Sequence, residues 1–335
     1  MEMAEELCVI GDGGMGTVCA IMLAENGHDV VLWSAFAEQA RQLAADRENK
    51  RFLPGAALPD NVRVTADDAE AFAGVSLAIS AVPTQFVRGV WGRLGPKCPS
   101  GLPICSVAKG IENDTLLRPT EVLADVIGGQ PDRSLAALSG PSIAPEVAAK
   151  LPATVVVAAT DSDLASRVQR LINRSYFRVY TNPDLLGVEI AGATKNVVAI
   201  AAGILDGMKI GDNAKAGLVS RGLSEITRLG VAMGAQAETF AGLAGIGDLV
   251  TTCISPVGRN RSFGEAIGRG LSVDEALVAS HGVVEGVATT ESVMALAKRY
   301  NAVMPITSGI YDVLFNHVDP QAAIHELMSR PLKAE

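Results

Sequence analysis

The sequence predicts an α/β fold in which a doubly wound parallel sheet is followed by an all-helical second domain. Three observations support this prediction. A glycine-rich turn lies between an apolar run and a helical stretch near the N-terminus, apolar runs and helical stretches alternate as far as about residue 180, and only helical spacing follows. Alternating strands and helices are typical of a parallel sheet that is covered by helices on both faces.

The elements expected in the first half of the chain follow from its short apolar runs. Leu7 to Ile10 predicts the first strand, TVCAIMLAEN at 17–26 predicts a helix, and Val30 to Trp33 predicts the second strand. Later runs predict further strands of the same sheet, separated by helices such as those at 116–128 and 163–174. These strands are expected near 75–82, 102–108, 134–140 and 153–159.

The turn after the first strand reads GDGGMG and carries the spacing GxGxxG at Gly11, Gly13 and Gly16. The first glycine permits a tight turn, the second lets a pyrophosphate approach the backbone, and the third brings the helix close to the sheet. Free N–H groups at the start of the helix then face the phosphates. A glycine-rich turn without a ligand is the alternative, but the flanking strands and helix supply the context that dinucleotide binding requires. We therefore expect NAD or NADP as the cofactor.

The choice between NAD and NADP depends on the end of the second strand. An NAD site usually places an acid there, which binds the 2′-hydroxyl of the ribose. This stretch reads LWSAF, so Ser34 and Ala35 provide neither that acid nor an arginine for a 2′-phosphate, and Arg41 lies several residues farther on. The missing acid favours NADP mildly.

The pattern changes after about Asn182, where long segments rich in Ala, Leu, Ile and Val have helical spacing and no convincing strand. We therefore expect a dinucleotide-binding Rossmann domain at 1–180 and a helical substrate and catalytic domain at 181–335, with the active site in the crevice between them. The helices of the second domain are expected at 187–205, 214–233, 272–279, 289–300 and 320–328.

Composition and charge narrow the class of protein. A chain of 335 residues exceeds what one hydrophobic core usually organises, which favours two domains. Hydrophobic residues make up 48% and aromatic residues only 4%, so the cores must consist largely of Ala, Val, Leu and Ile. The net charge of −9 argues against a nucleic acid or an anionic membrane surface as the main partner. Local lysines and arginines can still hold a small anionic substrate.

The N-terminus and the cysteines indicate a cytoplasmic protein. MEMAEELCVIGDGG has acids where a signal peptide would have bases, and no apolar run approaches the roughly 18 residues of a membrane span. Five cysteines without a CxxC pair indicate reduced, mostly buried thiols, with no disulfide and no metal. A metal-dependent enzyme is a poor alternative because the four histidines lack ligand spacing. They are His28, His281, His317 and His325.

A first candidate for catalysis lies in GVEIAGATKNVVAIAAGI at 187–204, where Lys195 and Asn196 interrupt an apolar helix of small residues. A lysine in such a place is costly unless it is paired or functional. Partial desolvation lowers the pKa of a lysine toward working pH, which makes it a proton donor or acceptor. The alternative is a surface lysine whose stem lies along the wet face of the helix.

A second candidate is GLAGIGDLVTTCISPVGRNRSFG at 242–264, which combines a glycine-rich turn, a lone acid at Asp248 and a basic cluster. The cluster consists of Arg259, Asn260 and Arg261. Two arginines around an asparagine suit a phosphate, because the guanidinium fork matches phosphate oxygens in pairs. Taken alone, a solvated basic loop is the more ordinary interpretation.

Ten segments in order resemble those of the bacterial-type NAD(P)-dependent glycerol-3-phosphate dehydrogenases, from about residue 7 to the C-terminus. The resemblance implies a Rossmann domain, a helical domain like that of 6-phosphogluconate dehydrogenase, and a cytoplasmic homodimer. It also implies a phosphorylated triose as substrate and a supply of glycerol 3-phosphate for phospholipid synthesis. The segments are GDGGMGT, FLPGAALPDNV, SVAKGIE, LSGPSIAPEV, GATKNVVAIAAGILDG, GDNAKAGLVSRGLSEI, GLAGIGDLVTTC, GRNRSFG, VVEGVATTE and SRPLKAE.

The resemblance assigns catalytic roles to four residues. Lys195 matches the catalytic lysine that exchanges a proton with the C2 oxygen, and Lys109 matches a second lysine that touches substrate and cofactor. Asp248 and Thr252 match a pair that orders Lys195 and the substrate. Without the resemblance, Lys109 would be an ordinary loop lysine and Asp248 a helix cap.

The remaining matches concern binding. Gly140 and Ser142 in SGPS match substrate positions, although GPS also suits a simple turn. Val283 and Glu285 match positions near the cofactor, although an acid in the first turn of a helix is also ordinary. The substrate set is completed by Gly258, Arg259 and Asn260, of which Arg259 also reaches the cofactor. The cofactor set is completed by Gly11, Gly13, Gly14, Met15, Gly16, Ala35, Lys109 and Ala144.

Three departures from the family pattern are specific. The family usually has a serine and then an aromatic residue where this chain has Gly14 and Met15, and often a basic residue where this chain has Ala35. These two departures weaken any expectation about NADP. The third removes one hydroxyl from the expected phosphate site, because Gly258 stands where the family usually has serine.

Two other functions remain as alternatives. An oxidoreductase of the same architecture, such as a 3-hydroxyacid or ketopantoate-type reductase, would need a clamp for a carboxylate. A sensor or scaffold that binds the dinucleotide without turnover would not need Lys109, Lys195, Asp248 and Arg259 together.

Overall fold

The computed structural model describes residues 4–127, 134–280 and 282–332. Contacts between backbone positions divide the chain into two compact units. We call them the sheet unit, Met1–Lys109 with Leu117–Val188, and the helical unit, Gly110–Leu116 with Glu189–Glu335. The division near residue 180 stays a prediction. His281, the end of the helix expected at 116–128 and the last residues of the SRPLKAE segment lie outside the described residues.

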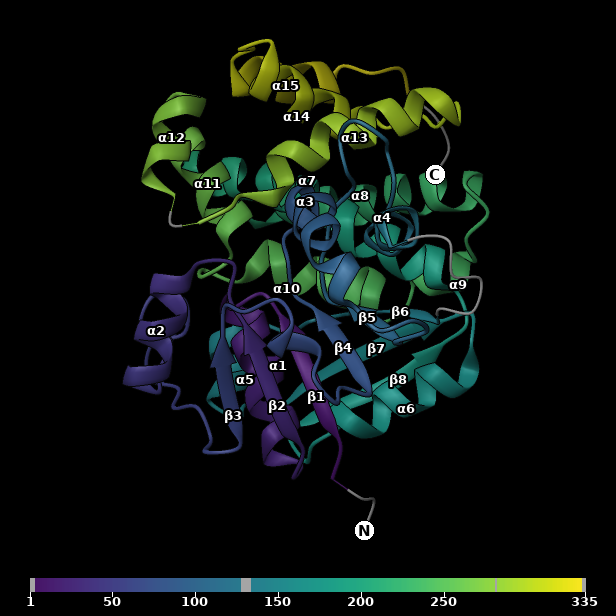
Figure 1. Cartoon of the computed structure of the whole chain (residues 1–335). Coiled ribbons are helices and arrows are strands. Elements are labelled where there is room, and N and C mark those ends of the chain that lie inside the picture. Colours follow the sequence, from purple (N-terminus) through teal and green to yellow (C-terminus); the bar gives the residue numbers. More distant parts are fainter. Residues whose placement is uncertain (1–3, 128–133, 281, 333–335) are drawn as a thin grey trace. The chain divides into compact units, whose positions relative to one another are not determined.

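The sheet unit contains one eight-stranded sheet with the order β3-β2-β1-β4-β5-β6-β7-β8 (Figure 1). The predicted doubly wound parallel sheet is confirmed, with one antiparallel pair, β6 and β7. The alternation of strands and helices could not reveal that pair, because it carries no information about strand direction. The strands are β1 Glu6–Ile10, β2 Asp29–Trp33, β3 Val62–Thr65, β4 Leu77–Ser80, β5 Ile104–Ser106, β6 Leu135–Ser139, β7 Ala153–Ala159 and β8 Phe177–Asn182.

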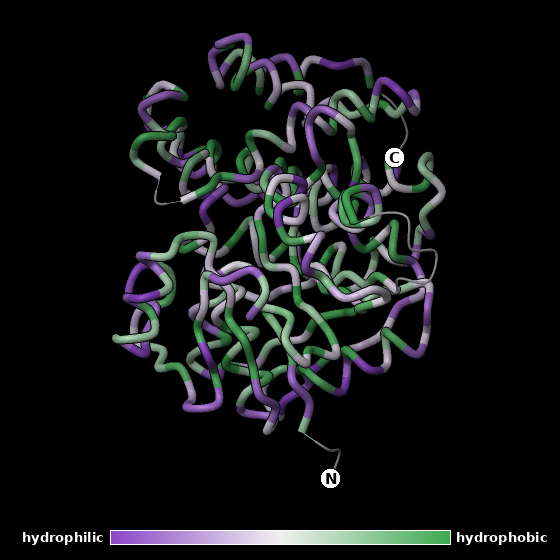
Figure 2. Tube along the Cα trace, in the orientation of Figure 1, coloured by the Kyte–Doolittle hydropathy of each residue, from purple (hydrophilic) through white to green (hydrophobic). Residues whose placement is uncertain are grey.

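Helices cover both faces of the sheet, and β1 shows why. Leu7 and Val9 pack in one core with α1 and α6, whereas Cys8 and Ile10 pack in a second core with α3 and α4. A strand that is buried on both faces is apolar on both, as β1 is from Leu7 to Ile10. In Figure 2 the strands inside the sheet are mostly green, whereas purple and green alternate along α2. The helices are α1 Gly14–Glu25, α2 Ala37–Asp46, α3 Thr84–Leu94, α4 Pro119–Val126, α5 Ala144–Ala148 and α6 Ser162–Ile172, with short 3-10 turns at Glu70–Phe72 and Gly95–Lys97.

Two strands were not predicted, and both lie at edges of the sheet. β3 has only four residues, of which Arg63 is exposed. β8 alternates buried and exposed positions, with Phe177 and Val179 inside and Arg178 and Tyr180 outside. Edge strands need fewer apolar residues than inner strands, so their runs are too short and too polar to stand out in the sequence.

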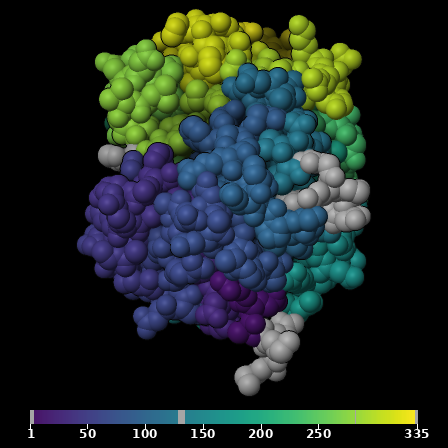
Figure 3. Space-filling view, viewed as in Figure 1, coloured from purple at the N-terminus to yellow at the C-terminus, as the bar shows by residue number. Residues whose placement is uncertain are grey.

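The regular elements that the structure describes in the helical unit are all helices, as expected. α7 and α11 lie backbone to backbone, because a Cβ atom at Gly203 would lie 1.9 Å from the Arg261 carbonyl oxygen and one at Gly264 would lie 2.0 Å from that of Ile200. Figure 3 shows that side chains fill the space between the C-terminal helices, coloured green to yellow. The helices are α7 Leu185–Gly207, α8 Asp212–Ala232, α9 Ala237–Phe240, a π turn at Leu243–Gly247, α10 Asp248–Ile254, α11 Arg259–Gly268, α12 Val273–Ala279, α13 Glu285–Arg299, α14 Pro305–Phe315 and α15 Pro320–Met328.

α7 is long enough to cross a membrane and has a mean hydropathy of 1.5 over its most apolar stretch. The sequence shows no uninterrupted apolar run of that length, because Glu189 and Lys195 lie within the helix. The whole stretch is buried inside the protein, as is usual for a core helix.

Candidate active site

The glycine-rich turn between β1 and α1 has the geometry that its sequence predicts. Gly11 adopts φ +106°, and a Cβ atom there would lie 2.8 Å from the Ala81 carbonyl oxygen. A Cβ atom at Gly16 would lie 1.9 Å from the carbonyl oxygen of Gly11. No atom lies within 4 Å of the corresponding position at Gly13. Gly11 and Gly16 are therefore required by the turn itself, and Gly13 leaves the open space that a pyrophosphate needs.

The start of α1 is suited to an anion. Gly13 is its N-cap and provides no side chain for the first N–H groups, and the first turn of the helix contains no acid. Gly14 lies beside the start of α5, because its Cβ position would be 3.6 Å from the Cβ of Ala144. Four of the expected cofactor positions, Gly13, Gly14, Met15 and Ala144, therefore surround one helix N-terminus. This arrangement fits the phosphates of a dinucleotide.

At the end of β2 the side chains are engaged locally. Ser34 is fully buried, its hydroxyl donates to the Phe36 carbonyl oxygen at 3.3 Å, and it accepts from the Phe36 N–H at 3.3 Å. Arg41 forms an ion pair with Glu38 at 2.5 Å, and both side chains are exposed. Arg41 is therefore held beside a carboxylate of its own helix.

In the sheet unit, Lys109, Gly140 and Ser142 come together although 31 residues separate the first two. The Lys109 ammonium and the Ser142 hydroxyl both donate to the Gly140 carbonyl oxygen, each at 3.0 Å. Gly140 has φ +126° and a Cβ atom there would lie 3.0 Å from the Cα of Val155, so the turn requires glycine. These three expected substrate positions form one cluster beyond the ends of β5 and β6.

In the helical unit, Lys195 is buried and ion-paired. Only 6% of the residue is exposed, which excludes the alternative of a surface lysine. Its Nζ donates to Asp248 Oδ1 at 2.5 Å and to Thr252 Oγ1 at 2.6 Å. Thr252 in turn donates to the Asp248 carbonyl oxygen at 2.7 Å. The cap of α10 is Gly247, so Asp248 serves Lys195 instead of capping the helix.

Cys253 lies beside this lysine and was not singled out from the sequence. Burial raises the pKa of its thiol to about 12, and the nearby charges of Lys195 and Lys215 lower it only in part. The thiol is therefore neutral at working pH. This buried thiol therefore provides no second base.

Arg259 and Asn260 lie at the start of α11 and face the start of α13. The Arg259 guanidinium donates to the Val283 carbonyl oxygen at 3.0 Å, and Asn260 Oδ1 accepts the Gly286 N–H at 2.9 Å. Glu285 is the first residue of α13 and the acid of its first turn. This agrees with the interpretation of VVEG as an ordinary helix start, which we gave as the alternative to a cofactor position. The expected phosphate positions and the expected cofactor positions of this unit thus form a second cluster.

Gly258 is the N-cap of α11 and contributes no side-chain hydrogen bond to it. The first turn of α11 contains no acid. The opening N–H groups of α11 therefore have no hydroxyl cap, and Arg259 is the first residue of this helix. A helix N-terminus beside an arginine is a favourable place for a phosphate.

Arg261 does not belong to this cluster. Its guanidinium pairs with Asp206 at 2.6 Å and with Glu265 at 3.3 Å, and Asp206 also pairs with Lys215. The idea that both arginines of GRNR hold phosphate is therefore wrong, because one of them is occupied by carboxylates. Neither Asp206 nor Lys215 was singled out from the sequence.

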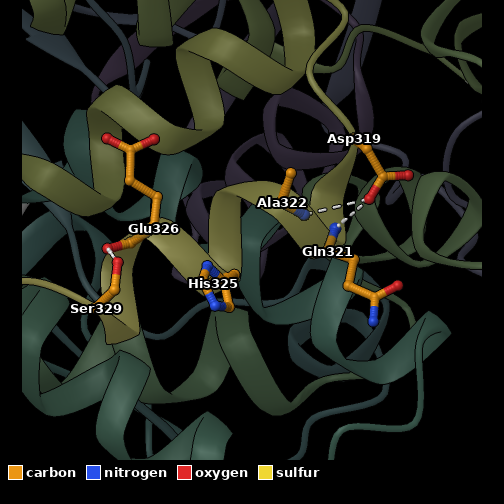
Figure 4. Close-up of a pocket in the computed structure, with 6 residues that line it drawn as sticks. All are labelled: Asp319, Gln321, Ala322, His325, Glu326 and Ser329. Carbon is orange, nitrogen blue, oxygen red and sulfur yellow. Dashed lines mark hydrogen bonds between the residues drawn. The ribbon is translucent and has the colours of Figure 1, made fainter.

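A hollow along α15 contains none of the expected site residues. Asp319 Oδ1 accepts the N–H groups of Gln321 and Ala322 at 2.8 and 3.2 Å, and the Ser329 hydroxyl donates to the Glu326 carbonyl oxygen at 3.0 Å. These are the contacts of a helix cap and a helix end. The hollow is lined by Asp319, Gln321, Ala322, His325, Glu326 and Ser329 (Figure 4).

Within residues 4–127, 134–280 and 282–332, no group of three or more His, Cys, Asp or Glu side chains is arranged to hold a metal ion. His281 lies outside these residues.

A glycine-rich turn that opens a doubly wound sheet, together with a buried lysine held by a carboxylate in a helical unit, defines the class of NAD(P)-dependent oxidoreductases with a helical second domain. The sequence matches the family profiles for the N-terminus of NAD-dependent glycerol-3-phosphate dehydrogenase at residues 6–165 and for its C-terminus at 184–325. The chain belongs to this family.

Individual relatives agree with that assignment. The glycerol-3-phosphate dehydrogenase (NAD(P)+) of Geobacter sp. strain M21 is 48% identical over 333 residues, which cover 99% of each chain. The crystal structure of glycerol-3-phosphate dehydrogenase from Coxiella burnetii is 37% identical, covers 98% of this chain and 99% of its own, and has a TM-score of 0.93. A ketopantoate reductase from Ralstonia eutropha, 14% identical with a TM-score of 0.60, shares the fold alone.

Proposed function

We propose that the protein interconverts sn-glycerol 3-phosphate and dihydroxyacetone phosphate with NAD or NADP. The observation that carries the proposal is the buried Lys195, whose ammonium is held by Asp248 and Thr252 at 2.5 and 2.6 Å. Burying a charged lysine is costly, and a helix of small apolar residues gains nothing in packing from it. The arrangement is explained by chemistry that needs a proton and a positive charge at one fixed point.

Lys195 exchanges the proton on the C2 oxygen. During reduction its ammonium meets the negative charge that grows on the carbonyl oxygen and donates a proton to it, and during oxidation the amine receives that proton back. Asp248 and Thr252 hold the nitrogen in place, so no reorganisation is needed when the charge develops. The bound nicotinamide supplies the hydride chemistry.

The substrate phosphate is held by Arg259, Asn260 and the first N–H groups of α11. Because Asn260 Oδ1 is turned toward the Gly286 N–H, its amide NH2 group is turned away from α13 and supplies two donors. Arg259 adds the positive charge. The phosphate is remote from C2, so this cluster binds substrate without taking part in the chemistry.

Lys109, with Gly140 and Ser142, is proposed to contact both substrate and cofactor. The Gly140 carbonyl oxygen orients the Lys109 ammonium and the Ser142 hydroxyl together. A second ammonium increases the electrostatic stabilisation of the oxyanion without a second proton transfer. Gly11, Gly13, Gly14, Met15, Gly16, Ala35, Ala144, Val283 and Glu285 are proposed to complete the cofactor site.

We also propose that the protein is a cytoplasmic homodimer with domains at 1–180 and 181–335, and that it supplies glycerol 3-phosphate for phospholipid synthesis. Membership of the family supports these proposals.

The test is to mix purified protein with dihydroxyacetone phosphate and either NADH or NADPH and to follow absorbance at the nicotinamide band. Oxidation of one or both cofactors is the expected result. A folded protein that binds a dinucleotide, but oxidises neither NADH nor NADPH in the presence of dihydroxyacetone phosphate, would contradict the proposal. A panel of 3-hydroxyacids and ketopantoate would then separate a reductase from a sensor.

A further inference from the structure

An acid reaches the end of β2 from the glycine-rich turn and not from the strand itself. Asp12, the residue between Gly11 and Gly13, is 8% exposed. Its Oδ2 accepts the Gln39 amide of α2 at 2.5 Å. Burial raises the pKa of this carboxyl, and the polar groups near it, including Ser34 and Gln39, lower the pKa only in part. Ser34 follows β2 directly, where an NAD site usually has its acid. The carboxylate that is missing from the strand is therefore supplied by the turn.

The position of Asp12 is set by a second anchor. The Asn49 side chain donates to the Asp12 carbonyl oxygen at 2.7 Å and to the Thr17 hydroxyl at 2.7 Å. With the backbone held by Asn49 and the carboxylate by Gln39, the acid has little freedom to turn away. A carboxylate has about four acceptor positions, so those not used by Gln39 can accept a ribose hydroxyl.

Two arginines in this region each lie beside an acid. Arg93 donates to the Ala35 carbonyl oxygen at 3.4 Å, but its guanidinium is held by both oxygens of Asp68 at 2.7 and 2.8 Å. Arg41 pairs with Glu38. A 2′-phosphate needs positive charge that is not already neutralised.

Arg51 is the third arginine. It stacks on the Phe52 ring at 4.8 Å, donates to Gln39 Oε1 at 3.4 Å, and its charge acts on Asp12. This charge lowers the pKa of Asp12 in part and so favours its ionised form.

We propose that Asp12 is the residue that selects NAD over NADP, by accepting the ribose 2′-hydroxyl and repelling a 2′-phosphate. The inference rests on the proposed dinucleotide site and not on the triose substrate. It reverses the mild preference for NADP, which depended on the absence of an acid after β2. Because Asp12 is nearly buried, water screens its charge less than that of a surface carboxylate. Burial also raises the pKa of Asp12, so the repulsion is expected only at pH values above that pKa.

The test measures binding without turnover. Dissociation constants of ADP-ribose and 2′-phospho-ADP-ribose are measured by calorimetry for the unmodified protein, for Asp12→Asn and for Asp29→Asn. Asparagine keeps the shape of Asp12 and an acceptor for Gln39 but removes the charge. Asp29 is exposed at the start of β2, the end of that strand that lies away from Ser34. Asp29→Asn is therefore the matched control for the loss of one negative charge.

The unmodified protein is expected to bind ADP-ribose more tightly than the phosphorylated ligand. Asp12→Asn is expected to shift the ratio of the two constants by about tenfold toward the phosphorylated ligand, since like charges in close contact are strongly unfavourable. Asp29→Asn is expected to leave the ratio unchanged. Equal ratios in the two variants would overturn the proposal, and so would tighter binding of the phosphorylated ligand by the unmodified protein.

A salt series on the unmodified protein keeps the proposal testable if Asp12→Asn does not fold. Repulsion between Asp12 and the 2′-phosphate is screened by salt, so the preference for ADP-ribose is expected to narrow between low and high ionic strength. A preference for ADP-ribose that widens at high ionic strength would show that the protein attracts the 2′-phosphate, and would contradict the proposal. Binding of neither ligand would overturn the dinucleotide site as well, whereas binding with the expected ratio but no triose turnover would overturn only the proposed substrate.

Discussion

Lys195 Nζ lies 2.5 Å from Asp248 Oδ1, with 7% and 3% of the two side chains exposed. Fifty-three residues separate them in the chain. The pair brings α7 and α10 together at the point where Thr252, one turn farther along α10, also accepts from the ammonium. A buried ion pair of this kind is rarely the most stable choice for a core. Its position indicates that the charge is retained for function.

Replacing Lys195 by methionine is expected to lower kcat by about 10²- to 10⁴-fold, the usual contribution of a positioned acid or base. Methionine keeps most of the length of the side chain, so the fold should survive. Lys298→Met, an exposed lysine of α13, is the control. The measurement is steady-state turnover together with a thermal melting curve. Near-normal turnover in the Lys195 variant would show that its proton-transfer role is wrong.

Replacing Arg259 by alanine is expected to raise KM for glycerol 3-phosphate roughly ten- to hundredfold, the effect of losing a hydrogen bond to a charged group. A smaller change in kcat is expected, because the phosphate is remote from the reacting carbon. Arg269→Ala, at the exposed C-cap of the same helix, should leave KM unchanged. A fall in kcat as large as the rise in KM would mean that Arg259 acts on the transition state.

Replacing Gly258 by serine should restore a hydroxyl to the cap of α11. The backbone there has φ −73° and ψ 117°, and a Cβ atom would meet its nearest neighbours, Ser255 and Thr252 carbonyl oxygens, at 3.4 and 3.5 Å. The helix should gain a few tenths of a kcal/mol. KM for glycerol 3-phosphate should fall by roughly two- to fivefold, since the hydroxyl adds a donor to the phosphate site.

Gly217→Ser is the control for this change. Gly217 lies in α8 and no atom is within 4 Å of its Cβ position, so serine there adds a hydroxyl without touching α11. Serine at 217 should change the melting temperature slightly and KM not at all. An unchanged or higher KM in Gly258→Ser would show that the helix start does not contact the phosphate.

Glu25, at the end of α1, makes the free energy of unfolding depend on pH in the acid range. Burial raises its pKa, but hydrogen bonds from Lys150 and Tyr176 and the charge of Arg174 outweigh burial and lower the pKa below the ordinary 4.5. The ionised form is therefore favoured by folding. This stabilisation is present above the unfolded-state pKa and is lost as pH falls through the folded-state pKa.

Glu25→Gln is expected to lower the free energy of unfolding by on the order of 1 kcal/mol at pH 7. The difference from the unmodified protein should narrow as pH falls below about 4. Unfolding by denaturant at several pH values measures this difference in the free energy of unfolding. Glu146→Gln, exposed on α5, should show no such trend. A difference that grows toward acid pH would have the wrong sign for this account.

Much of the fold could be predicted because it depends on local periodicity. The strand, turn, helix and strand at the N-terminus and most helices after 185 follow from the spacing of apolar residues. The roles of Gly11 and Gly16 also follow from local sterics, since a side chain at either position would collide with backbone nearby. The edge strands β3 and β8 were not predicted, because they are short or partly exposed.

The candidate site was predicted in part. Spacing alone identified Lys195 as unusual and GRNR as basic, but it could not tell a buried lysine from an exposed one or a phosphate arginine from a paired one. The structure separates them, because Asp248 neutralises Lys195 and Asp206 occupies Arg261. Each of these partners lies more than fifty residues away in the chain.

The sequence by itself determined the class of fold, the glycine-rich turn and the residues able to carry the chemistry, because these depend on neighbours within a few positions. Only the tertiary structure decided the direction of β6 against β7, the partners of Lys195 and Arg261, and the hydrogen bond between Asp12 and Gln39. The physical reason is that charge compensation and strand pairing are contacts between distant segments. They exist only once the chain has brought those segments together.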